Sequence, residues 1–468
     1  MFRMSSRRVV SPGFLALSCL MLCQTISSAS ASRPRKVIFD HDGGIDDYVT
    51  LLLLLASPEA VRVVGITILD ADCRAAVAWN TTLKLLHTLG HGAIPVAVSS
   101  LPAVNPFPDP WRNSVLSVDV MPLINDLTQE DLEPLRLSTP GEELMAQLLL
   151  GSGSGSGANS GTSSGSNATT RNNDRGNAGS AAGGYDKDGR DGDRGDGDDD
   201  DERITIVATG PLSNVAFVLK KYGRAAAARI REVWWMGGAM WVGGNVDFPG
   251  HDGSAEWNAF WDPAAVGEVW GWAEVPLIVV PLDATNAVPV TPDLIYRFGR
   301  QARHRYSVLA GTVWSRVVTW VYDRPHEPYY AWDTLTAACV LQPDLCEKLY
   351  DVESYAVVGG ASQGRTVPLA PSPDAVARTA GGGGDKGSCA VAPDAEAEQK
   401  EKEKVEKEEE VELQRAEEAR MLEELVEAGE GEGQETRRQH QSARRRVTVV
   451  KHVDAEAFYT FVLDTLRL

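Results

Sequence analysis

Cysteine is scarce in this sequence of 468 residues, which contains six. Two of them fall within the first 31 residues, and the other four are Cys73, Cys339, Cys346 and Cys389. The scatter of these four matches no zinc-binding spacing, and a domain of this size needs no disulfide framework. One bridge between Cys339 and Cys346, the nearest pair in sequence, and buried free thiols are both compatible with this distribution.

Basic charge is also deficient. The formal net charge is −20 at pH 7, because 65 acidic residues outnumber 45 Lys and Arg residues. A phosphate backbone requires a basic surface, so this composition argues against a nucleic-acid partner. Apolar residues make up 43% of the chain, which is enough for a sizeable core.

The apolar run near the N-terminus is too short to span a membrane. It covers residues 14–23, whereas a membrane-spanning helix needs about 20 apolar residues. Arg3, Arg7 and Arg8 precede it, and small residues follow at 28–32. This pattern predicts a signal peptide over residues 1–31, with an uncleaved anchor as the alternative. We expect a secreted protein, or one in the endomembrane or vacuolar lumen, without a membrane partner after cleavage.

Two internal segments have too few apolar residues to form a core. Residues 151–202 are rich in Gly, Ser and Asn and then in Asp, Gly and Arg, which predicts a low-complexity acidic insert. Residues 370–445 begin rich in Pro, Ala and Gly and continue as a Glu/Lys run, which predicts a low-complexity insert with a charged helix. We therefore expect one domain over residues 32–468, interrupted by these two inserts.

The remaining sequence alternates short apolar runs with helical patterns. The runs are continuous and rich in β-branched residues, as in strands buried on both faces. They cover residues 36–39, 61–68, 94–98, 204–208, 232–236 and 277–281. The clearest helical patterns cover residues 46–56, 75–89 and 263–270. This alternation predicts an α/β fold, a single domain with a doubly wound, mostly parallel sheet and helices on both faces.

Polar residues collect directly after the predicted strands and at one later helix start, and strand ends are where ligands bind in such folds. They are Asp40, Asp42, Asp46, Asp47, Asp70, Asp72, Thr209, Asn214, Asn245, Glu256, Asn258 and Asp333. Clustered carboxylates repel one another unless a cation lies among them, and oxygen ligands favour Ca²⁺ or Mg²⁺. Surplus amides and carboxylates suit a polyhydroxylated ligand such as a sugar. A metal-bound water beside an aspartate is a ready nucleophile.

These residues resemble the motifs of the inosine–uridine-preferring nucleoside hydrolases. The family's Asp-x-Asp-x-Gly-x-Asp-Asp signature stands at residues 40–47, and its Thr-Gly-Pro-Leu segment at 209–212. Its Met-Gly-Gly, Gly-Asn and Glu-Phe-Asn elements correspond to residues 236–238, 244–245 and 256–258, with Trp257 in place of Phe. The resemblance implies hydrolysis of the N-glycosidic bond of ribonucleosides to free base and ribose.

The resemblance also implies a role for each residue. The cofactor would be Ca²⁺, held by Asp42, Asp47, the backbone carbonyl of Thr209, and Asp333. Asp42 would also be the catalytic base that activates a calcium-bound water. The ribose hydroxyls would be bound by Asp46, Asn245, Glu256 and Asn258. The family's habit of forming dimers or tetramers leads us to expect a homodimer or homotetramer.

Three positions depart from the family pattern. Gly43 stands at a proline position of the family's first motif, which is a mild backbone change. Asp72 stands where many members have Asn, and its carboxylate would bind the sugar or the water. Trp332 stands where His, a candidate acid for the leaving base, often precedes the last aspartate. Tryptophan donates no useful proton at pH 7, but it can stack on a nucleobase. We also expect His251, His326, Tyr329 and Tyr330 to lie in segments that cover the site.

Two other functions fit parts of the pattern. A haloacid dehalogenase-type phosphatase would use Asp40 as nucleophile and Asp42 as acid, but Gly44 stands where such enzymes have Thr or Val. A secreted, non-catalytic ribose- or nucleoside-binding protein would need neither Asp42 nor Asp333, because binding requires no activated water. Release of base and ribose from a nucleoside distinguishes the hydrolase from both.

Overall fold

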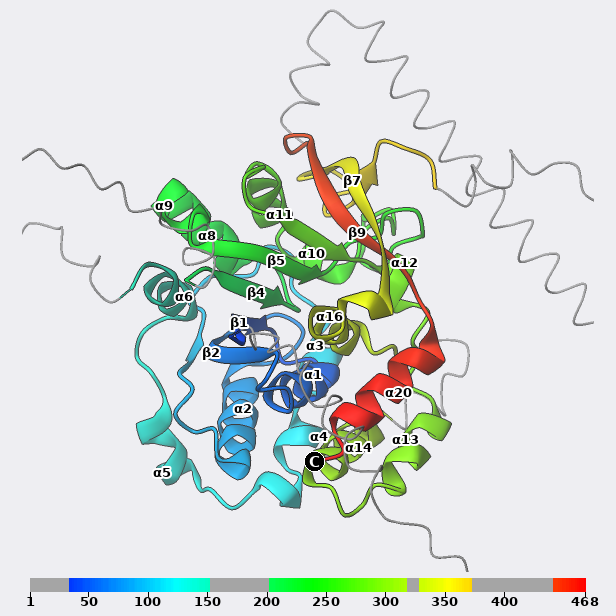
Figure 1. Cartoon of the computed structure of the whole chain (residues 1–468). Helices are drawn as coiled ribbons and strands as arrows, with labels where there is room; N and C mark the ends of the chain where they lie inside the picture. The colour runs from blue at the N-terminus through cyan, green and yellow to red at the C-terminus, as the bar shows by residue number, and fades with distance from the viewer. Residues whose placement is uncertain (1–32, 152–201, 318–327, 373–440) are drawn as a thin grey trace, which may run out of the picture.

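The computed structural model describes residues 33–151, 202–317, 328–372 and 441–468, which form one nine-stranded sheet with helices on both faces (Figure 1). The predicted signal peptide, nearly all of both predicted inserts, Cys389 and His326 lie outside the described residues. Arg445, at the predicted end of the second insert, is the first residue of a strand.

The sheet is mostly parallel, as predicted. Its strands are β1 (Arg35–His41), β2 (Val61–Ile68), β3 (Val96–Val98), β4 (Ile204–Ala208), β5 (Ile230–Met236), β6 (Leu277–Val280), β7 (Cys346–Ala356), β8 (Thr366–Pro368) and β9 (Arg445–Val453). Their order in space is β3-β2-β1-β4-β5-β6-β9-β7-β8. Strand β7 runs antiparallel to both of its neighbours, and the other pairs are parallel.

The six predicted strands correspond to β1 through β6, whereas the edge formed by β7, β8 and β9 was not predicted. Strand β3 begins at Val96, two residues later than expected, after Pro95, which lacks a backbone N–H to donate. Strand β7 changes register twice against β9, and Asp351 within it has φ of +58°. Such bulges break the regular pattern by which strands are identified in a sequence.

Helices cover both faces of the sheet (Figure 1). One face carries α1 (Ile45–Leu55), α2 (Ala75–Leu89), α13 (Pro292–Gly299), α14 (Arg305–Trp314), α16 (Trp332–Leu341) and α20 (Ala455–Thr465). The other carries α6 (Gly141–Leu150), α8 (Ser213–Tyr222), α9 (Arg224–Ala227) and α11 (Pro263–Trp270). Shorter elements are α3 (Asp109–Arg112), α4 (Leu116–Asp119), α5 (Gln129–Leu132), α10 (Trp257–Trp261), α12 (Leu282–Thr285), η1 (Pro122–Ile124), η2 (Glu133–Leu135), η3 (Ser315–Val317) and η4 (Pro343–Leu345).

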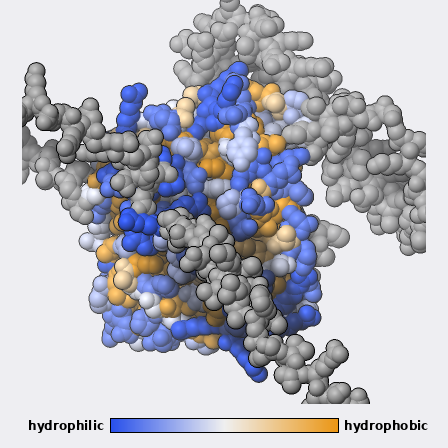
Figure 2. Space-filling view, in the orientation of Figure 1, coloured by the Kyte–Doolittle hydropathy of each residue, from blue (hydrophilic) through white to orange (hydrophobic). Residues whose placement is uncertain are grey.

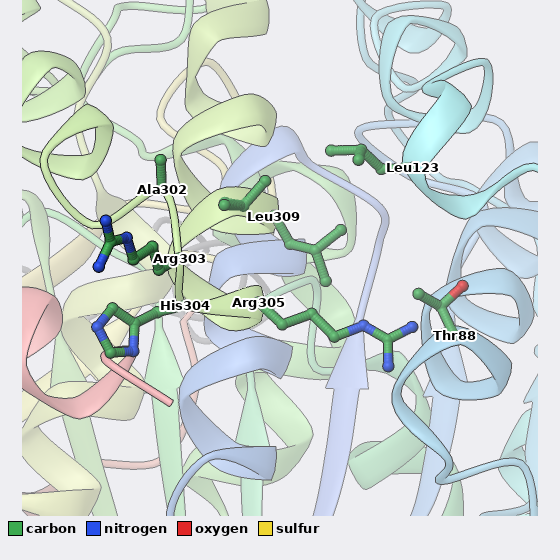
Figure 3. A pocket seen from close by; sticks show the side chains of 8 residues that line it. Thr88, Leu123, Ala302, Arg303, His304, Arg305 and Leu309 are labelled. Atoms are coloured by element: carbon green, nitrogen blue, oxygen red, sulfur yellow. The ribbon is translucent and has the colours of Figure 1, made fainter.

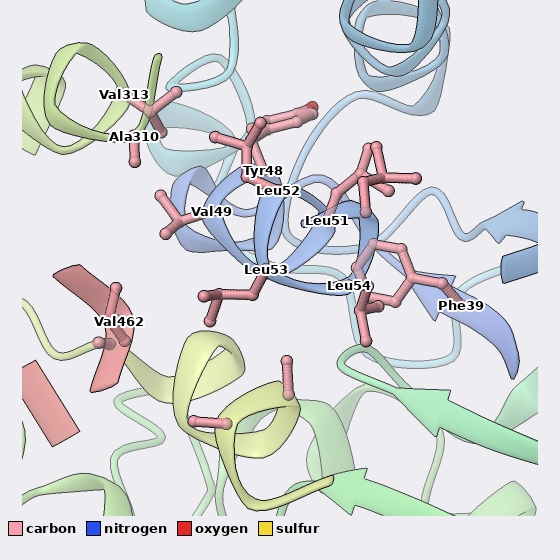
Figure 4. Close-up of a cluster of buried hydrophobic side chains, with 14 of the residues drawn as sticks. Phe39, Tyr48, Val49, Leu51, Leu52, Leu53, Leu54, Ala310, Val313 and Val462 are labelled. Carbon is pink, nitrogen blue, oxygen red and sulfur yellow. The ribbon is translucent and has the colours of Figure 1, made fainter. Parts of the chain in front are cut away.

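The core lies in two layers because successive side chains of a strand point to opposite faces. In β1, Val37 and Phe39 pack on the side of α1, whereas Ile38 packs with α6 and α8. Helix α1 is buried along its whole length and packs against α14 and α16, and Val49 faces Ala310 and Val313 of α14 (Figure 4). The helix that follows the first strand is therefore a central element of the core, which holds its first turn in place.

The surface on the face shown in Figure 2 is mostly hydrophilic, with separate hydrophobic areas between. No helix within the described ranges is long and apolar enough to cross a membrane. Cys339, in α16, forms a disulfide with Cys346, the first residue of β7. Cys73 is a buried free thiol.

Candidate functional site

The predicted site residues gather where β1, β2, β4 and β5 end. The chain runs from β1 outward to β3 and then returns to pair β4 with the other side of β1. Such a reversal leaves a crevice beyond the carboxyl ends of the two strands. Asp42 and Asp47 follow β1, Asp72 follows β2, and Thr209 follows β4. The loop after β5 and the first turn of α16 supply the others.

The loop after β1 turns sharply at Gly43, which has φ of +85°. A Cβ at this position would lie 2.6 Å from the Cβ of Ala78, so the turn requires glycine. The N–H of Gly43 donates to Oδ2 of Asp47 at 2.9 Å. The N–H of Asp72 donates to Oδ2 of Asp42 at 3.1 Å. The turn thus fixes the two aspartates that are expected to bind the cation.

A chain of hydrogen bonds joins Asp47 to the loop after β5. The hydroxyl of Thr209 donates to Oδ1 of Asp47 at 2.6 Å. The backbone carbonyl of Thr209 accepts from Nδ2 of Asn258 at 3.1 Å, and the same amide donates to the carbonyl of Met236 at 3.1 Å. Asn258 therefore orients the carbonyl expected to be a cation ligand, and the hydrogen atoms of its amide are already committed.

Glu256 caps helix α10 within the site. Its carboxylate accepts hydrogen bonds from the N–H groups of Asn258 at 2.8 Å, Gly238 at 2.9 Å and Ala259 at 3.2 Å. Burial raises the pKa of Glu256 to about 7, although these donors oppose the shift. Asn245 is joined to the same turn, since its Oδ1 accepts from the N–H of Trp257 at 3.1 Å.

Asp46 links helix α1 to helix α16. Its Oδ1 accepts from the hydroxyl of Tyr329 at 2.8 Å, and its Oδ2 accepts from the N–H of Asp333 at 2.8 Å. Its backbone carbonyl accepts from the hydroxyl of Thr334 at 3.2 Å. Asp46 thus holds the first turn of α16, which contains Asp333, next to helix α1. Tyr329, expected only to cover the site, is part of its framework.

Asp40 lies behind the loop and is completely buried. Its Oδ1 accepts from Thr67 at 2.6 Å and from Asn214 at 2.8 Å, while Oδ2 has no hydrogen-bond partner among the described residues. Burial raises its pKa to about 7. Asp40 is thus bound to side chains of β2 and α8 behind the loop, which disfavours the phosphatase alternative that requires Asp40 as nucleophile.

The carboxylates converge beside the bare backbone of Gly44. A Cβ on Gly44 would lie 3.0 Å from Oδ2 of Asp72, 3.5 Å from Oδ2 of Asp333 and 3.6 Å from Oδ1 of Asp46. Glycine therefore leaves open the space that these side chains border. Nevertheless, within the described part of the chain, no three His, Cys, Asp or Glu side chains are placed so that they could hold a metal ion.

Burial and mutual repulsion dominate the electrostatics of this group. The pKa of Asp42 is raised well above its ordinary value by burial and then by the charges of Asp47 and Asp72. The pKa of Asp333 is likewise raised, by burial and by Asp46 and Asp47. Burial and then Asp47 raise the pKa of Asp46 to about 7. A cation among these groups would relieve this repulsion.

Asp72 has a positively charged neighbour. Burial, Asp47 and Asp46 raise its pKa to about 7, and Arg112 opposes this increase. The sequence analysis did not identify Arg112, because the residue belongs to no motif and reaches the loop from a separate short helix, α3.

Trp332 forms one side of an aromatic group next to the carboxylates. Its ring lies 4.8 Å from that of Tyr329 and 5.7 Å from that of Tyr330, both edge-on. It also packs against Met236, Ala239 and Leu282. Tyr329 therefore contacts both Trp332 and Asp46, which places the tryptophan beside the predicted ribose site. His251, by contrast, accepts from Gly253 and packs on Phe260, which is a structural role.

Two cavities lie outside this group. One of about 180 Å³ is bordered by Thr88 at the far end of α2 and by residues at the start of α14 (Figure 3). There Arg305 extends toward Thr88, whereas Arg303 and His304 point the other way. A second, of about 440 Å³, is lined by Trp241, Val242, Asp283, Glu347, Ser372, Lys451 and His452. Neither contains a predicted site residue.

Known proteins with a similar sequence are nucleoside hydrolases. A family model described as inosine-uridine preferring nucleoside hydrolase matches residues 37–151 and 190–460. A pyrimidine-specific ribonucleoside hydrolase, RihB, of Escherichia coli (strain SE11) is 26% identical over 341 residues, which cover 71% of this chain and 87% of that protein.

Solved structures show the same fold. The crystal structure of an inosine-uridine preferring nucleoside hydrolase from Bacillus anthracis has a TM-score of 0.59 and 25% identity, and the alignment covers 92% of this chain and 99% of that one. The plant nucleoside hydrolase PpNRh1 has a TM-score of 0.58 and 18% identity over the same shares of the two chains.

Proposed function

The chain belongs to the inosine-uridine preferring nucleoside hydrolases and is a ribonucleoside hydrolase, and we propose that Asp42 is the base that deprotonates the attacking water. Asp42 is buried beside Asp47 and Asp72 in the loop after β1, next to the proposed cation site, so its carboxylate can accept a proton from a water held there. The N–H of Asp72 holds one of its oxygens in place. This arrangement is the observation that carries the proposal.

We propose Ca²⁺ as the cofactor, held by the carboxylates of Asp42, Asp47 and Asp333 and by the carbonyl of Thr209. The donor set fits, because it consists of oxygen atoms that are buried and carry uncompensated negative charge. A bound calcium ion would orient the water and lower its pKa.

The remaining polar residues are proposed to bind the ribose. They are Asp46, Asp72, Asn245, Glu256 and Asn258. The support is their position, since Asp46 follows β1, Asp72 follows β2, and the other three follow β5. Cleavage of the N-glycosidic bond builds positive charge on the sugar, and carboxylates next to the ring stabilise that charge. Burial of these carboxylates strengthens the interaction, because the surrounding dielectric is low.

The nucleobase is proposed to stack on Trp332, within the aromatic group that includes Tyr329 and Tyr330. Tyr329 is a poor candidate for the acid that protonates the leaving base. Burial and the charge of Asp46 raise its pKa well above the ordinary value, and its proton is committed to Asp46. Stacking would then contribute to base departure where no acid is available.

Action outside the cytoplasm is also proposed, from the sequence of residues 1–31. The disulfide between Cys339 and Cys346 supports it, because disulfides persist in oxidising compartments.

The proposed function is tested by measuring release of base and ribose from inosine, uridine and cytidine, with and without a calcium chelator. We expect turnover that the chelator abolishes and added Ca²⁺ restores. Unchanged turnover after complete chelation would exclude the cation. Ligand binding without turnover would favour the non-catalytic alternative.

The substitution Asp42→Asn tests the base directly. We expect kcat to fall by about 10³-fold or more, because the variant cannot accept the proton. Asp109→Asn, at an aspartate that is 79% exposed, is the matched control and should leave kcat unchanged. Near-normal turnover by a folded Asp42→Asn variant would contradict the mechanism.

A further inference from the structure

The turn that follows β2 is held from outside the site by a buried arginine. Nε of Arg112 donates to the carbonyl of Ala71 at 3.1 Å, and Nη2 donates to the carbonyl of Asp70 at 3.0 Å. Nη2 also lies 2.6 Å from Oδ2 of Asp70. The side chain of Arg112 is 9% exposed. One guanidinium therefore binds two successive carbonyl groups and a carboxylate of the same turn.

This turn leads directly to the proposed base. Asp72 follows the two carbonyls that Arg112 binds, and its N–H is the donor to Oδ2 of Asp42. The next residue, Cys73, donates its N–H to the carbonyl of Asp42 at 3.1 Å. The position of the turn thus determines where the carboxylate of Asp42 points.

The opposite side of the turn is fixed as well. Oδ1 of Asp70 accepts from the N–H of Ala75, which begins helix α2, at 2.8 Å. The carbonyl of Arg112 itself accepts from the N–H of Arg74 at 3.0 Å. Between these two hydrogen bonds, the planar guanidinium of Arg112 orients the peptide groups of Asp70 and Ala71. A lysine ammonium has no such planar arrangement of donors.

We propose that Arg112 is a positioning residue for catalysis, which acts through the Asp70–Asp72 turn to orient Asp42. The inference rests on the proposed function of Asp42. Arg112 touches neither substrate nor cofactor in this scheme. Asp72, which is proposed to bind the ribose, lies on the same turn, so the effect of Arg112 is expected mainly in kcat, through Asp42, and to a smaller extent in KM.

The test compares Arg112→Met and Arg112→Lys with the wild type, with kcat and KM measured per folded molecule. Since a displacement of about 1 Å can cost roughly 100-fold in rate, we expect Arg112→Met to lower kcat by about 10- to 100-fold, a larger change than the one in KM. Arg112→Lys keeps the charge but not the fork, so it should recover part of kcat. If Arg112→Met does not fold, the kcat of Arg112→Lys is compared with that of the wild type instead.

Arg74→Met is the matched control. Arg74 also binds α3, through Asp109 at 2.7 Å, but it is exposed and contacts neither turn carbonyl, so kcat should be unchanged. Wild-type kcat in the folded Arg112 variants, or a change confined to KM, would overturn the inference. If Asp42→Asn abolishes turnover while the Arg112 variants retain wild-type turnover, only the proposed role of Arg112 is contradicted. Turnover by Asp42→Asn would instead contradict the proposed function of Asp42.

Discussion

Asp40 shows how strongly burial acts on a single side chain in this loop. Its pKa is raised from 3.8 to about 7, first by loss of solvent, despite two hydrogen bonds to Oδ1. Because the folded-state pKa is above the unfolded one, the folded protein binds more protons between these values. The contribution of Asp40 to stability is therefore fully present below about pH 4, and it is lost as the pH rises through about 7.

We therefore expect Asp40→Asn to change the pH dependence of stability. The variant has no carboxylate to ionise at this position. The difference in unfolding free energy between variant and wild type should therefore shift in favour of the variant from pH 4 to pH 8, by at most about 4 kcal/mol. Chemical denaturation at both pH values, in the presence of chelator, measures this difference. An equal difference at pH 4 and pH 8 would show that Asp40 does not titrate in this range.

The sequence predicts the positions of some site residues but not of others. Asp42, Asp46 and Asp47 follow a recognisable strand, and strand ends of a parallel sheet meet at one edge, so their proximity could be predicted. Thr67 and Arg112 could not be assigned, because each contacts a segment that lies far from it in sequence. Only the folded chain shows that Arg112 reaches the turn before Asp72.

Helix α16 presents Trp332 and Asp333 in its first turn and carries the disulfide near its other end. The first turn is anchored separately, by the contacts of Asp333 and Thr334 with Asp46. The disulfide therefore stabilises the junction between α16 and β7, while the functional end of the helix is fixed by hydrogen bonds.

This separation predicts the effect of the double substitution Cys339→Ala and Cys346→Ala. Stability should fall by about 2 kcal/mol, or roughly 5 °C in Tm, while kcat/KM measured well below Tm is retained. Thermal unfolding and nucleoside hydrolysis provide the two measurements. A loss of activity as large as that of Asp42→Asn would show that the disulfide also orients Asp333.

Elements were predicted well where they repeat a simple pattern. Strands β2 and β4 and helices α2 and α11 have the expected bounds, since each is a continuous apolar run or a regular helical face. The β7–β9 edge was not predicted, because bulges and charged side chains interrupt the alternation of apolar residues by which strands are recognised. The disulfide was left open, since sequence proximity does not establish the geometry of a bridge.

For the molecule as a whole, the first predicted insert is attached away from the site. The described chain stops at Gly151, after α6, and resumes at Glu202, just before β4 begins. The site lies beyond the opposite, carboxyl end of β4. The two points of attachment are thus separated from the catalytic residues by the length of that strand.

We expect replacement of residues 152–201 by a short Gly/Ser linker to leave kcat/KM within about twofold of the full chain. Steady-state hydrolysis of the preferred nucleoside by the two proteins measures this. A drop of the size expected for Asp42→Asn, with Tm unchanged, would show that the replaced segment contributes to the site.

The hydrogen bond between Asp46 and Asp333 joins residues that are 287 positions apart. At synthesis rates of about 5–20 residues per second, roughly 15–60 s pass between the appearance of these two residues. During that interval the aspartate loop exists without the helix that completes it. The proposed cation site is therefore complete only late in synthesis, once α16 has emerged.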